Sequence, residues 1–203
     1  MASEIEFKYA NYEGTPPSAS TTSFTITPKT GVDIWRKPPT THVFDAPMLY
    51  KSFPISKFLR SRVTVSAKWQ TLYDQGGMVF IMPQANGTKK WIKSGIEFYK
   101  GRPFVSTVSA DNWADWSLAE TDKEKPEELT LEFERNPEEG TLWIYVVRGD
   151  DRIPVREVTW ALYDPEGTAE CWVGVYVGKP TQSAEGVEDL VVSFKDFQLD
   201  LRD

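Results

Sequence analysis

Residues that could do chemistry alternate along one predicted strand of this chain, which runs through Trp91, Lys93 and Glu97. Alternate side chains of a strand point to the same side, so these three share one face. Ile92 and Ile96 occupy the opposite face and belong to the core. Lys93 and Glu97 stand about 13 Å apart along an extended strand, which is too far for an ion pair but suits two groups that bracket a ligand. Either could act as an acid or a base if burial moved its pKa, so we predict both as catalytic residues.

Two further strands present aromatic side chains in the same alternation. Trp172 and Tyr176 lie opposite a face of small apolar residues, and Trp143 takes a similar place on the strand predicted over 141–148. Aromatic faces stack on the apolar side of a sugar ring while charged groups bind its hydroxyls, so this surface suits a small polar or ring-bearing ligand. The loop before Gly76 could point polar groups into the same groove. The predicted ligand-binding residues are Tyr73, Asp74, Gln75, Trp91, Trp143, Trp172 and Tyr176.

Each of these residues also has a structural alternative. Aromatic residues cover half-buried strands because β-propensity favours them there. Asp74 could cap a turn, and Lys93 and Glu97 could each form an ion pair with a neighbouring strand.

Gly95 and Gly174 lie between the aromatic residues, where a missing side chain would let a ligand approach the backbone.

Other kinds of site find less support in the sequence. Glu132 and Glu134 share one face of a predicted hairpin and could divide acid and base roles, but exposed acids on a hairpin are ordinarily just solvated. His42 is the single histidine and Cys171 the single cysteine, so nucleophilic triads and histidine-based zinc sites lack partners. The oxygen-rich loop at 111–115 is more typical of turns than of calcium sites. We therefore predict no metal and no cofactor.

Composition narrows the class of protein further. The chain has 203 residues, 40% of them apolar, which suits one β-sandwich domain over 1–203. A net charge of −7 without any basic block makes nucleic acid and anionic membranes unsuitable partners. The first residues carry neither a basic nor an apolar leader segment, nowhere do eighteen apolar residues run together, and a single cysteine suits a reducing compartment. We expect a cytoplasmic protein.

The elements that position these residues are short runs of period two bounded by Gly, Pro, Asn and Asp. This punctuation predicts an all-β sandwich of two antiparallel sheets, with 1–22 as an irregular surface segment. A four-residue loop at 136–139 would place Leu131 opposite Ile144 and Phe133 opposite Leu142. The predicted strands are Ser23–Thr27, Arg62–Gln70, Met78–Met82, Lys90–Tyr99, Phe104–Ser109, Leu129–Arg135, Thr141–Arg148, Val155–Ala161, Ala169–Val177 and Leu190–Leu201.

Several short motifs, in one order, also resemble a known family. They are Trp35–Pro39, Tyr73–Gly77, Trp91–Glu97, Ser106–Ser109 with Asp115–Ser117, and Val173–Tyr176 with Val192–Phe197. Together they resemble the fungal and bacterial domain family typified by the regulation of enolase protein, from Trp35 to the end of the chain. The resemblance implies a concanavalin A-like lectin/glucanase jelly roll, intracellular in the fungal members, with no settled activity. The chain lacks the Glu-x-Asp-x-x-Glu strand that glucanases of this fold share.

Three functions follow as hypotheses. The first is a lectin-like β-sandwich that binds a carbohydrate or other small molecule in an aromatic, charge-dotted groove. The second is a cofactor-independent isomerase, lyase or cyclase that acts on a metabolite in the same groove, so the sequence leaves open whether the protein is an enzyme. The third is a regulatory domain whose partner is another protein. The oligomeric state is open as well.

Overall fold

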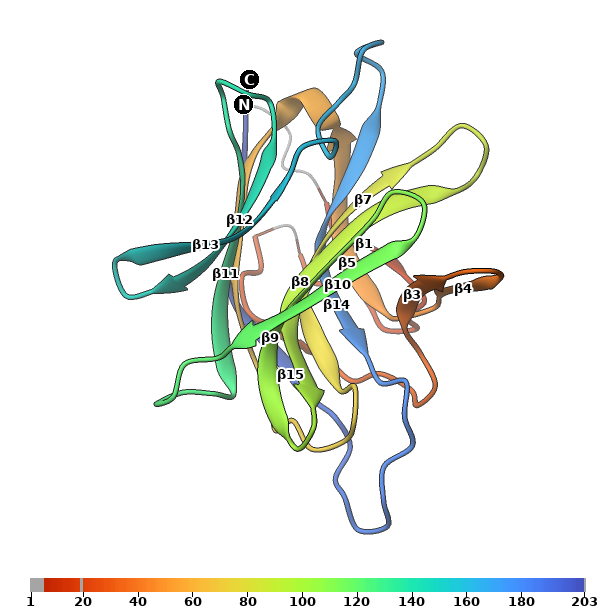
Figure 1. Cartoon of the computed structure of the whole chain (residues 1–203), viewed down its shortest axis with the longest axis vertical. Helices are drawn as coiled ribbons and strands as arrows, with labels where there is room; N and C mark the ends of the chain where they lie inside the picture. The colour runs from red at the N-terminus through yellow and green to blue at the C-terminus, as the bar shows by residue number, and fades with distance from the viewer. Residues whose placement is uncertain (1–5, 19, 203) are drawn as a thin grey trace.

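Two antiparallel sheets stacked face to face form the body of the molecule (Figure 1). The computed structural model describes residues 6–18 and 20–202. Seven strands form one sheet, in the order β1 (Lys8–Ala10), β5 (Met48–Pro54), β14 (Glu170–Gly178), β7 (Gln75–Pro83), β8 (Lys89–Tyr99), β9 (Arg102–Ala110) and β10 (Ala114–Glu120). Six form the other, in the order β13 (Asp151–Val158), β12 (Leu142–Arg148), β11 (Glu128–Arg135), β6 (Phe58–Ser66), β15 (Val192–Leu201) and β2 (Phe24–Ile26). The predicted all-β sandwich is confirmed.

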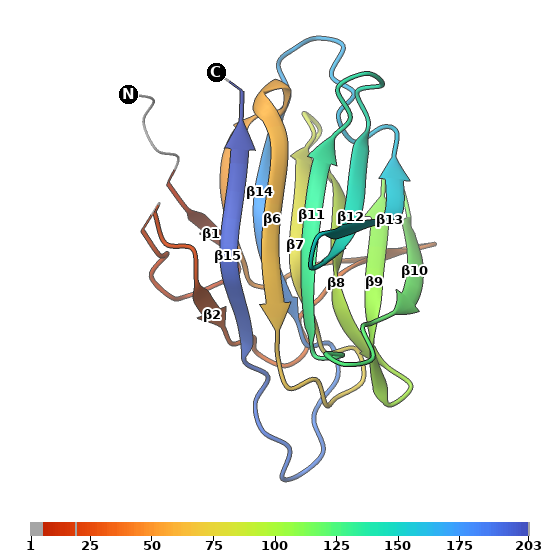
Figure 2. The same cartoon turned by 90° about the vertical axis from the view of Figure 1, so that its left-hand side faces the viewer.

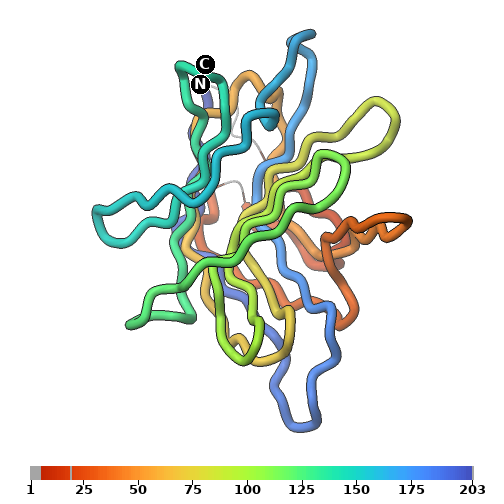
Figure 3. The backbone as a smooth tube through the Cα atoms, in the orientation of Figure 1, coloured from red at the N-terminus to blue at the C-terminus, as the bar shows by residue number. Residues whose placement is uncertain are grey.

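A small hairpin and a short turn complete the described chain. The hairpin consists of β3 (Ile34–Lys37) and β4 (Thr41–Phe44), which form a two-stranded sheet of their own, and its tip projects outward in Figure 3. The turn is the 3-10 element η1 (Ile55–Lys57), between β5 and β6. Within the described residues, no helix combines the length and the apolar character needed to cross a membrane.

The six-stranded sheet is apolar on one face only. In Figure 2 this sheet faces the viewer and the seven-stranded sheet lies behind it. Alternate residues of its strands, such as Val63 and Val65 on β6 or Leu131 and Phe133 on β11, enter the core between the sheets. The residues between them stay partly exposed, with few exceptions. The alternation is the pattern expected of a sheet with one solvated face.

The seven-stranded sheet is buried on both faces over its central strands. Its inner face carries residues such as Phe80, Ile92 and Ile96 into the main core. Its outer face carries a second apolar cluster, which the β3–β4 hairpin joins through Ile34, Trp35 and Phe44. The sheet members of this cluster are Met48, Tyr50, Val79, Ile81, Trp91, Val108, Ala110 and Tyr176. The hairpin therefore acts as a third layer over part of the sheet.

All ten predicted strands overlap an observed strand, but five observed strands were not predicted. They are β1, β3, β4, β5 and β10. β5 escapes the pattern because residues 48–51 are all buried, so the strand shows no apolar–polar alternation. β1 lies in the segment predicted to be irregular and pairs with β5, whereas residues 1–5 and 19 fall outside the described residues.

The hairpin between β11 and β12 has the predicted loop length, but the predicted register is wrong by two residues. Leu131 lies opposite Val146, and Phe133 lies opposite Ile144. The four-residue loop is 137–140, because Gly140 takes a positive φ of 69° that suits the loop and not a strand. A shift of two keeps every side chain on its predicted face.

Candidate functional site

A cavity of about 320 Å³ opens on the outer face of the seven-stranded sheet, next to the β3–β4 hairpin. β7 and β8 provide buried polar groups, β3 and β10 provide two tryptophans and Lys37, and the loops before β3, β7 and β15 complete the wall. Its volume lies in the range of small-molecule sites. The lining residues are Asp33, Trp35, Lys37, Tyr73, Gln75, Lys93, Glu97, Trp116 and Pro180.

Lys93 lies in the wall of this cavity with only 3% of its surface exposed. Its ammonium donates to Gln75 Oε1 (2.7 Å) and to Asp33 Oδ1 (3.2 Å). Gln75 Nε2 in turn donates to the same Asp33 oxygen (3.2 Å), and the Tyr176 hydroxyl donates to Gln75 Oε1 (3.3 Å). A buried ammonium needs such a set of acceptors to remain charged. Lys93 is therefore a fixed, paired cation.

Glu97 follows Lys93 on the same face of β8, at i+4, and is 5% exposed. The Ser106 hydroxyl donates to Glu97 Oε2 (2.6 Å) and accepts in turn from Trp116 Nε1 (3.0 Å). Burial raises the pKa of Glu97, and this effect outweighs the opposite influence of Lys93 and of the Ser106 hydrogen bond. A carboxyl group in this setting can hold a proton closer to neutral pH than an exposed one, and can give it to a bound ligand.

Aromatic rings form the rest of the wall and continue past the cavity. Trp116 meets Trp35 at 6.2 Å and 85°, and Tyr73 at 6.4 Å and 68°, between ring centroids. Tyr99 stacks on Tyr73 at 5.9 Å and meets Trp116 edge to face at 5.5 Å. All four rings are half-buried. Such a surface can stack on a ligand ring while the buried polar groups bind its substituents.

Tyr73 is held in place by a strained turn. Its φ of 65° lies in the left-handed region, and its backbone N–H donates to Phe98 O (2.8 Å). Asp74 stabilises the turn because Oδ2 accepts from the backbone N–H of Thr71 (2.9 Å) and Oδ1 accepts from Lys179 Nζ (3.0 Å). Asp74 thus caps the turn behind the cavity instead of lining it, as its structural alternative anticipated.

Lys179 connects this turn to the segment that carries Asp33. Its ammonium binds Asp74, while its backbone pairs with Val32 and accepts from the N–H of Gly31 (2.8 Å). Both Lys179 and Asp74 are almost fully buried. One residue therefore positions two loops that meet at the cavity.

The predicted alternation on β8 is confirmed, but not every residue of the predicted site reaches the cavity. Ile92 and Ile96 enter the main core, and Trp91 lies on the same side as Lys93 and Glu97. Trp91 and Tyr176, however, are buried beneath the cavity in the outer cluster. Four of the predicted residues line the cavity: Tyr73, Gln75, Lys93 and Glu97.

Two predicted tryptophans lie elsewhere. Trp172 stacks on Tyr50 at 4.5 Å, on the outer face of the same sheet but outside the cavity lining. Trp143 belongs to β12 of the six-stranded sheet and stacks on Tyr145 at 6.1 Å. Its assignment to the same groove is wrong, because alternation along a strand tells which residues share a face and not which sheet that face belongs to.

The glycines between the aromatic residues serve the backbone of the sheet, not a ligand. A Cβ on Gly95 would lie 2.0 Å from Gly76 O, and one on Gly174 would lie 2.0 Å from Leu49 O. The close approach expected at these positions is therefore made by the neighbouring strands.

Five residues that line the cavity were not predicted from the sequence: Asp33, Trp35, Lys37, Trp116 and Pro180. Trp35 and Trp116 stand in motifs that supported the family resemblance, which was the available signal. Because β3 and β10 were not predicted as strands, neither tryptophan was assigned to the site.

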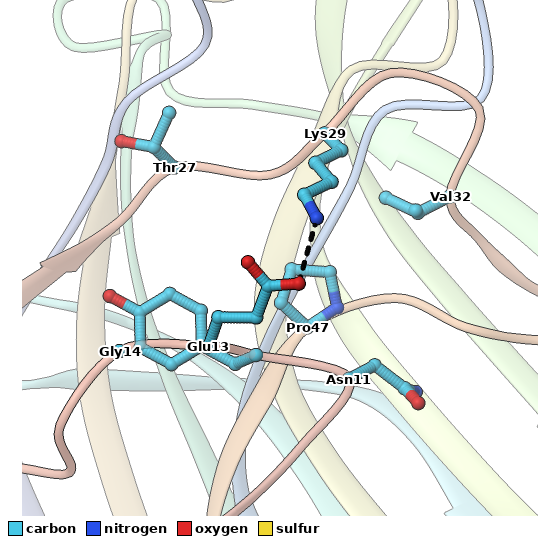
Figure 4. A pocket seen from close by; sticks show the side chains of 8 residues that line it. Asn11, Glu13, Gly14, Thr27, Lys29, Val32 and Pro47 are labelled. Carbon is cyan, nitrogen blue, oxygen red and sulfur yellow. Dashed lines mark hydrogen bonds and ion pairs between the residues drawn. The ribbon is translucent and has the colours of Figure 1, made fainter.

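A second pocket of about 500 Å³ lies along the first part of the chain (Figure 4). Its polar contact is an ion pair of 3.0 Å between Lys29 and Glu13, two exposed side chains. Exposed ion pairs contribute little free energy, so this contact does not mark a built site. In addition, the described residues contain no group of three or more His, Cys, Asp or Glu side chains placed to hold a metal ion.

Comparison with known proteins gives both close and distant relatives. The chain is 44% identical over 180 residues to "Uncharacterized protein AN7484" of Emericella nidulans, covering 89% of this chain and 87% of that protein. A shorter stretch of 59 residues is 32% identical to "Regulation of enolase protein 1" of Saccharomyces cerevisiae, covering 29% and 28% of the two chains. The resemblance inferred from the motifs is thus confirmed.

Solved structures give the same fold. A functionally unknown protein from Saccharomyces cerevisiae superposes with a TM-score of 0.76 at 22% identity over 97% of both chains. A glycoside hydrolase family protein from Mycobacterium thermorestibile superposes with a TM-score of 0.52 at 10% identity, over 94% of this chain and 98% of that one. The fold is therefore the predicted concanavalin A-like jelly roll.

The family described as "Protein of unknown function (DUF1349)" matches residues 12–201, which include every residue that lines the cavity. Because this match spans nearly the whole chain, the protein belongs to that family.

Proposed function

We propose that the protein binds a small polar, ring-bearing molecule in the cavity beside the β3–β4 hairpin. The observation that carries this proposal is the burial of a lysine, a glutamate and a glutamine in the wall of one cavity that also has aromatic walls. Buried charged groups are costly, so a fold that needed only an apolar layer here would be more stable with apolar residues. Their convergence on an open space is typical of a binding site.

The fold supports a carbohydrate as one candidate ligand. The protein from Mycobacterium thermorestibile that has this jelly roll is described as a glycoside hydrolase family protein. Trp35, Tyr73 and Trp116 could stack on a sugar ring, while Lys93 and Glu97 could bind its hydroxyls. The same arrangement would accept other ring-bearing metabolites.

Binding can be tested with a panel of mono- and disaccharides and small ring-bearing metabolites, by thermal shift and then by calorimetry. Trp116→Ala removes one wall and should weaken any bound ligand about tenfold or more. Trp143→Ala is the matched control, because it removes a half-buried tryptophan of the other sheet and should leave affinity unchanged. A ligand that binds both variants equally well would place the site outside this cavity.

A second candidate, an enzyme without a cofactor, is favoured by one observation. Glu97 combines a raised pKa with a hydrogen bond from Ser106 that would stabilise the carboxylate left after proton transfer. Glu97 could thus protonate an oxygen or carbon of the ligand as a bond beside it rearranges. If so, Glu97→Gln should abolish turnover while the ligand still binds. A pure binding protein would have no turnover to lose.

A further inference from the structure

The charges around the cavity leave one buried carboxylate without a cationic partner. Lys93 is already bound to Asp33 and Gln75, and its ammonium also lies 5.6–5.9 Å from the ring centroids of Trp35, Trp91 and Tyr176. In the part of the chain that the structure describes, no lysine or arginine nitrogen lies within 4.0 Å of a Glu97 oxygen. The hydrogen bond from Ser106 occupies Oε2 only.

Lys37 is the other cation of the lining, and it lies at the exposed end of β3. Because the residue is exposed, removing its ammonium from solvent to reach a buried carboxylate would be costly. The side chain therefore contributes positive charge at the mouth of the cavity and leaves the interior to a ligand.

The groups next to Glu97 suit one kind of ligand atom. Trp116, Trp35 and Tyr73 meet at angles of 85° and 68°, so their rings form corners in the cavity wall. An ammonium is attracted to the faces of such rings and to a carboxylate at the same time. A hydroxyl in that place would form a hydrogen bond but would leave the carboxylate charge uncompensated.

We infer that the ligand of this cavity carries a protonated amine, which pairs with Glu97 and lies against the rings of Trp35, Tyr73 and Trp116. This inference rests on the proposed function, because it names the chemical class of the molecule bound at the same site. A cavity of this kind would bind amines more tightly than neutral molecules of the same size and shape.

The test uses probes that differ only in this group. Three amines are each compared with the alcohol or sugar that has a hydroxyl in place of the amino group: D-glucosamine with D-glucose, tyramine with tyrosol, and tryptamine with tryptophol. Calorimetry on the wild-type chain at pH 7 should show at least one amine binding ~10-fold or more tightly than its partner, since a desolvated charge pair adds about 1.4 kcal/mol or more. This comparison needs no variant.

Variants then locate the effect. Glu97→Gln keeps the size of the side chain and an acceptor for Ser106, and should reduce the amine to the affinity of its neutral partner. Glu134→Gln, an acid on the six-stranded sheet, should leave the preference unchanged. Lys37→Gln should leave the preference intact or enlarge it, because it removes a positive charge from the mouth.

Two results would overturn the inference, and they differ from failure of the proposed function. If amine and neutral partner bind equally well and both weaken in Trp116→Ala, the cavity binds ligands but does not select amines. If the preference persists in Glu97→Gln, the amine pairs with another group. If neither these probes nor the wider panel shows binding that depends on Trp116, both proposals fail.

Discussion

Two buried glutamates, one on the outer face of each sheet, have opposite surroundings. Glu132 on the six-stranded sheet is 1% exposed, and Arg152 lies 2.5 Å from one of its oxygens while Arg60 (3.5 Å) and Arg62 (3.9 Å) approach the other. None of these three contacts has the geometry of a hydrogen bond. Glu97 on the seven-stranded sheet has a hydroxyl donor but no arginine or lysine within 4.0 Å among the described residues.

The difference separates a charge that is paired within the fold from one that we propose a ligand pairs. Three arginines surround Glu132, so the hairpin acid that the sequence suggested would be solvated is in fact buried and ion-paired. Glu97 faces a cavity without a directly paired cation, and Lys93 offsets the cost of its burial only in part, which the fold alone would not favour. The buried pair of Asp74 and Lys179 adds a third case, in which both partners are almost fully buried.

The largest effect on stability should come from breaking the ion pair between Asp74 and Lys179. Asp74→Asn keeps the acceptor for the turn but leaves the Lys179 ammonium buried without a counter-charge. We expect a loss of about 3–5 kcal/mol in the free energy of unfolding, measured by urea denaturation. Glu188→Gln breaks the exposed pair with Lys68 and should cost under about 1 kcal/mol. Equal losses in both variants would mean that burial does not set the strength of these pairs.

An intermediate effect is expected at Glu132. Glu132→Gln leaves three arginines without their shared carboxylate, but these side chains are 35–40% exposed and water can solvate them. The loss should therefore be about 1–3 kcal/mol in the same denaturation experiment. A stability gain would contradict the structural role given to Glu132.

The smallest effect, and one of opposite sign, is expected at Glu97. Its folded-state pKa is raised, so the native state binds more protons than the unfolded state between the two pKa values. The contribution of Glu97 to stability is thus present in acid and is lost as pH rises through the raised pKa. Glu97→Gln removes this dependence, although Lys93 and Asp33 still face the position.

Thermal denaturation of the Glu97→Gln variant and the wild type across pH 4 to 8 tests this pH dependence of stability. The two melting temperatures should be close near pH 4, and the variant should melt a few degrees higher at pH 8, since about 1 kcal/mol corresponds to ~2–4 °C at this chain length. A variant that melts lower at pH 8 would show that the carboxylate is stabilised by its surroundings.

Two residues of the candidate site could be predicted from residue alternation. Lys93 and Glu97 share a face with each other, opposite Ile92 and Ile96, because side chains of a strand alternate whatever the sheet does. Tyr73 and Gln75 were found from the loop before two glycines. The all-β class and the jelly roll also followed from the spacing of strands and the motifs.

What the sequence could not decide was which faces meet. The strands of Trp143 and Lys93 show the same alternating pattern but belong to different sheets. Which sheet each strand joins depends on its pairing with strands that are distant in the chain. β5 has no alternation to detect because the β3–β4 hairpin covers its second face. Trp116 reaches the cavity because β10 pairs with β9, whereas Asp33 and Trp35 come from the hairpin region and reach Glu97 through the packing of that third layer. Alternation is a local consequence of backbone geometry, whereas a cavity depends on contacts between residues far apart in the chain.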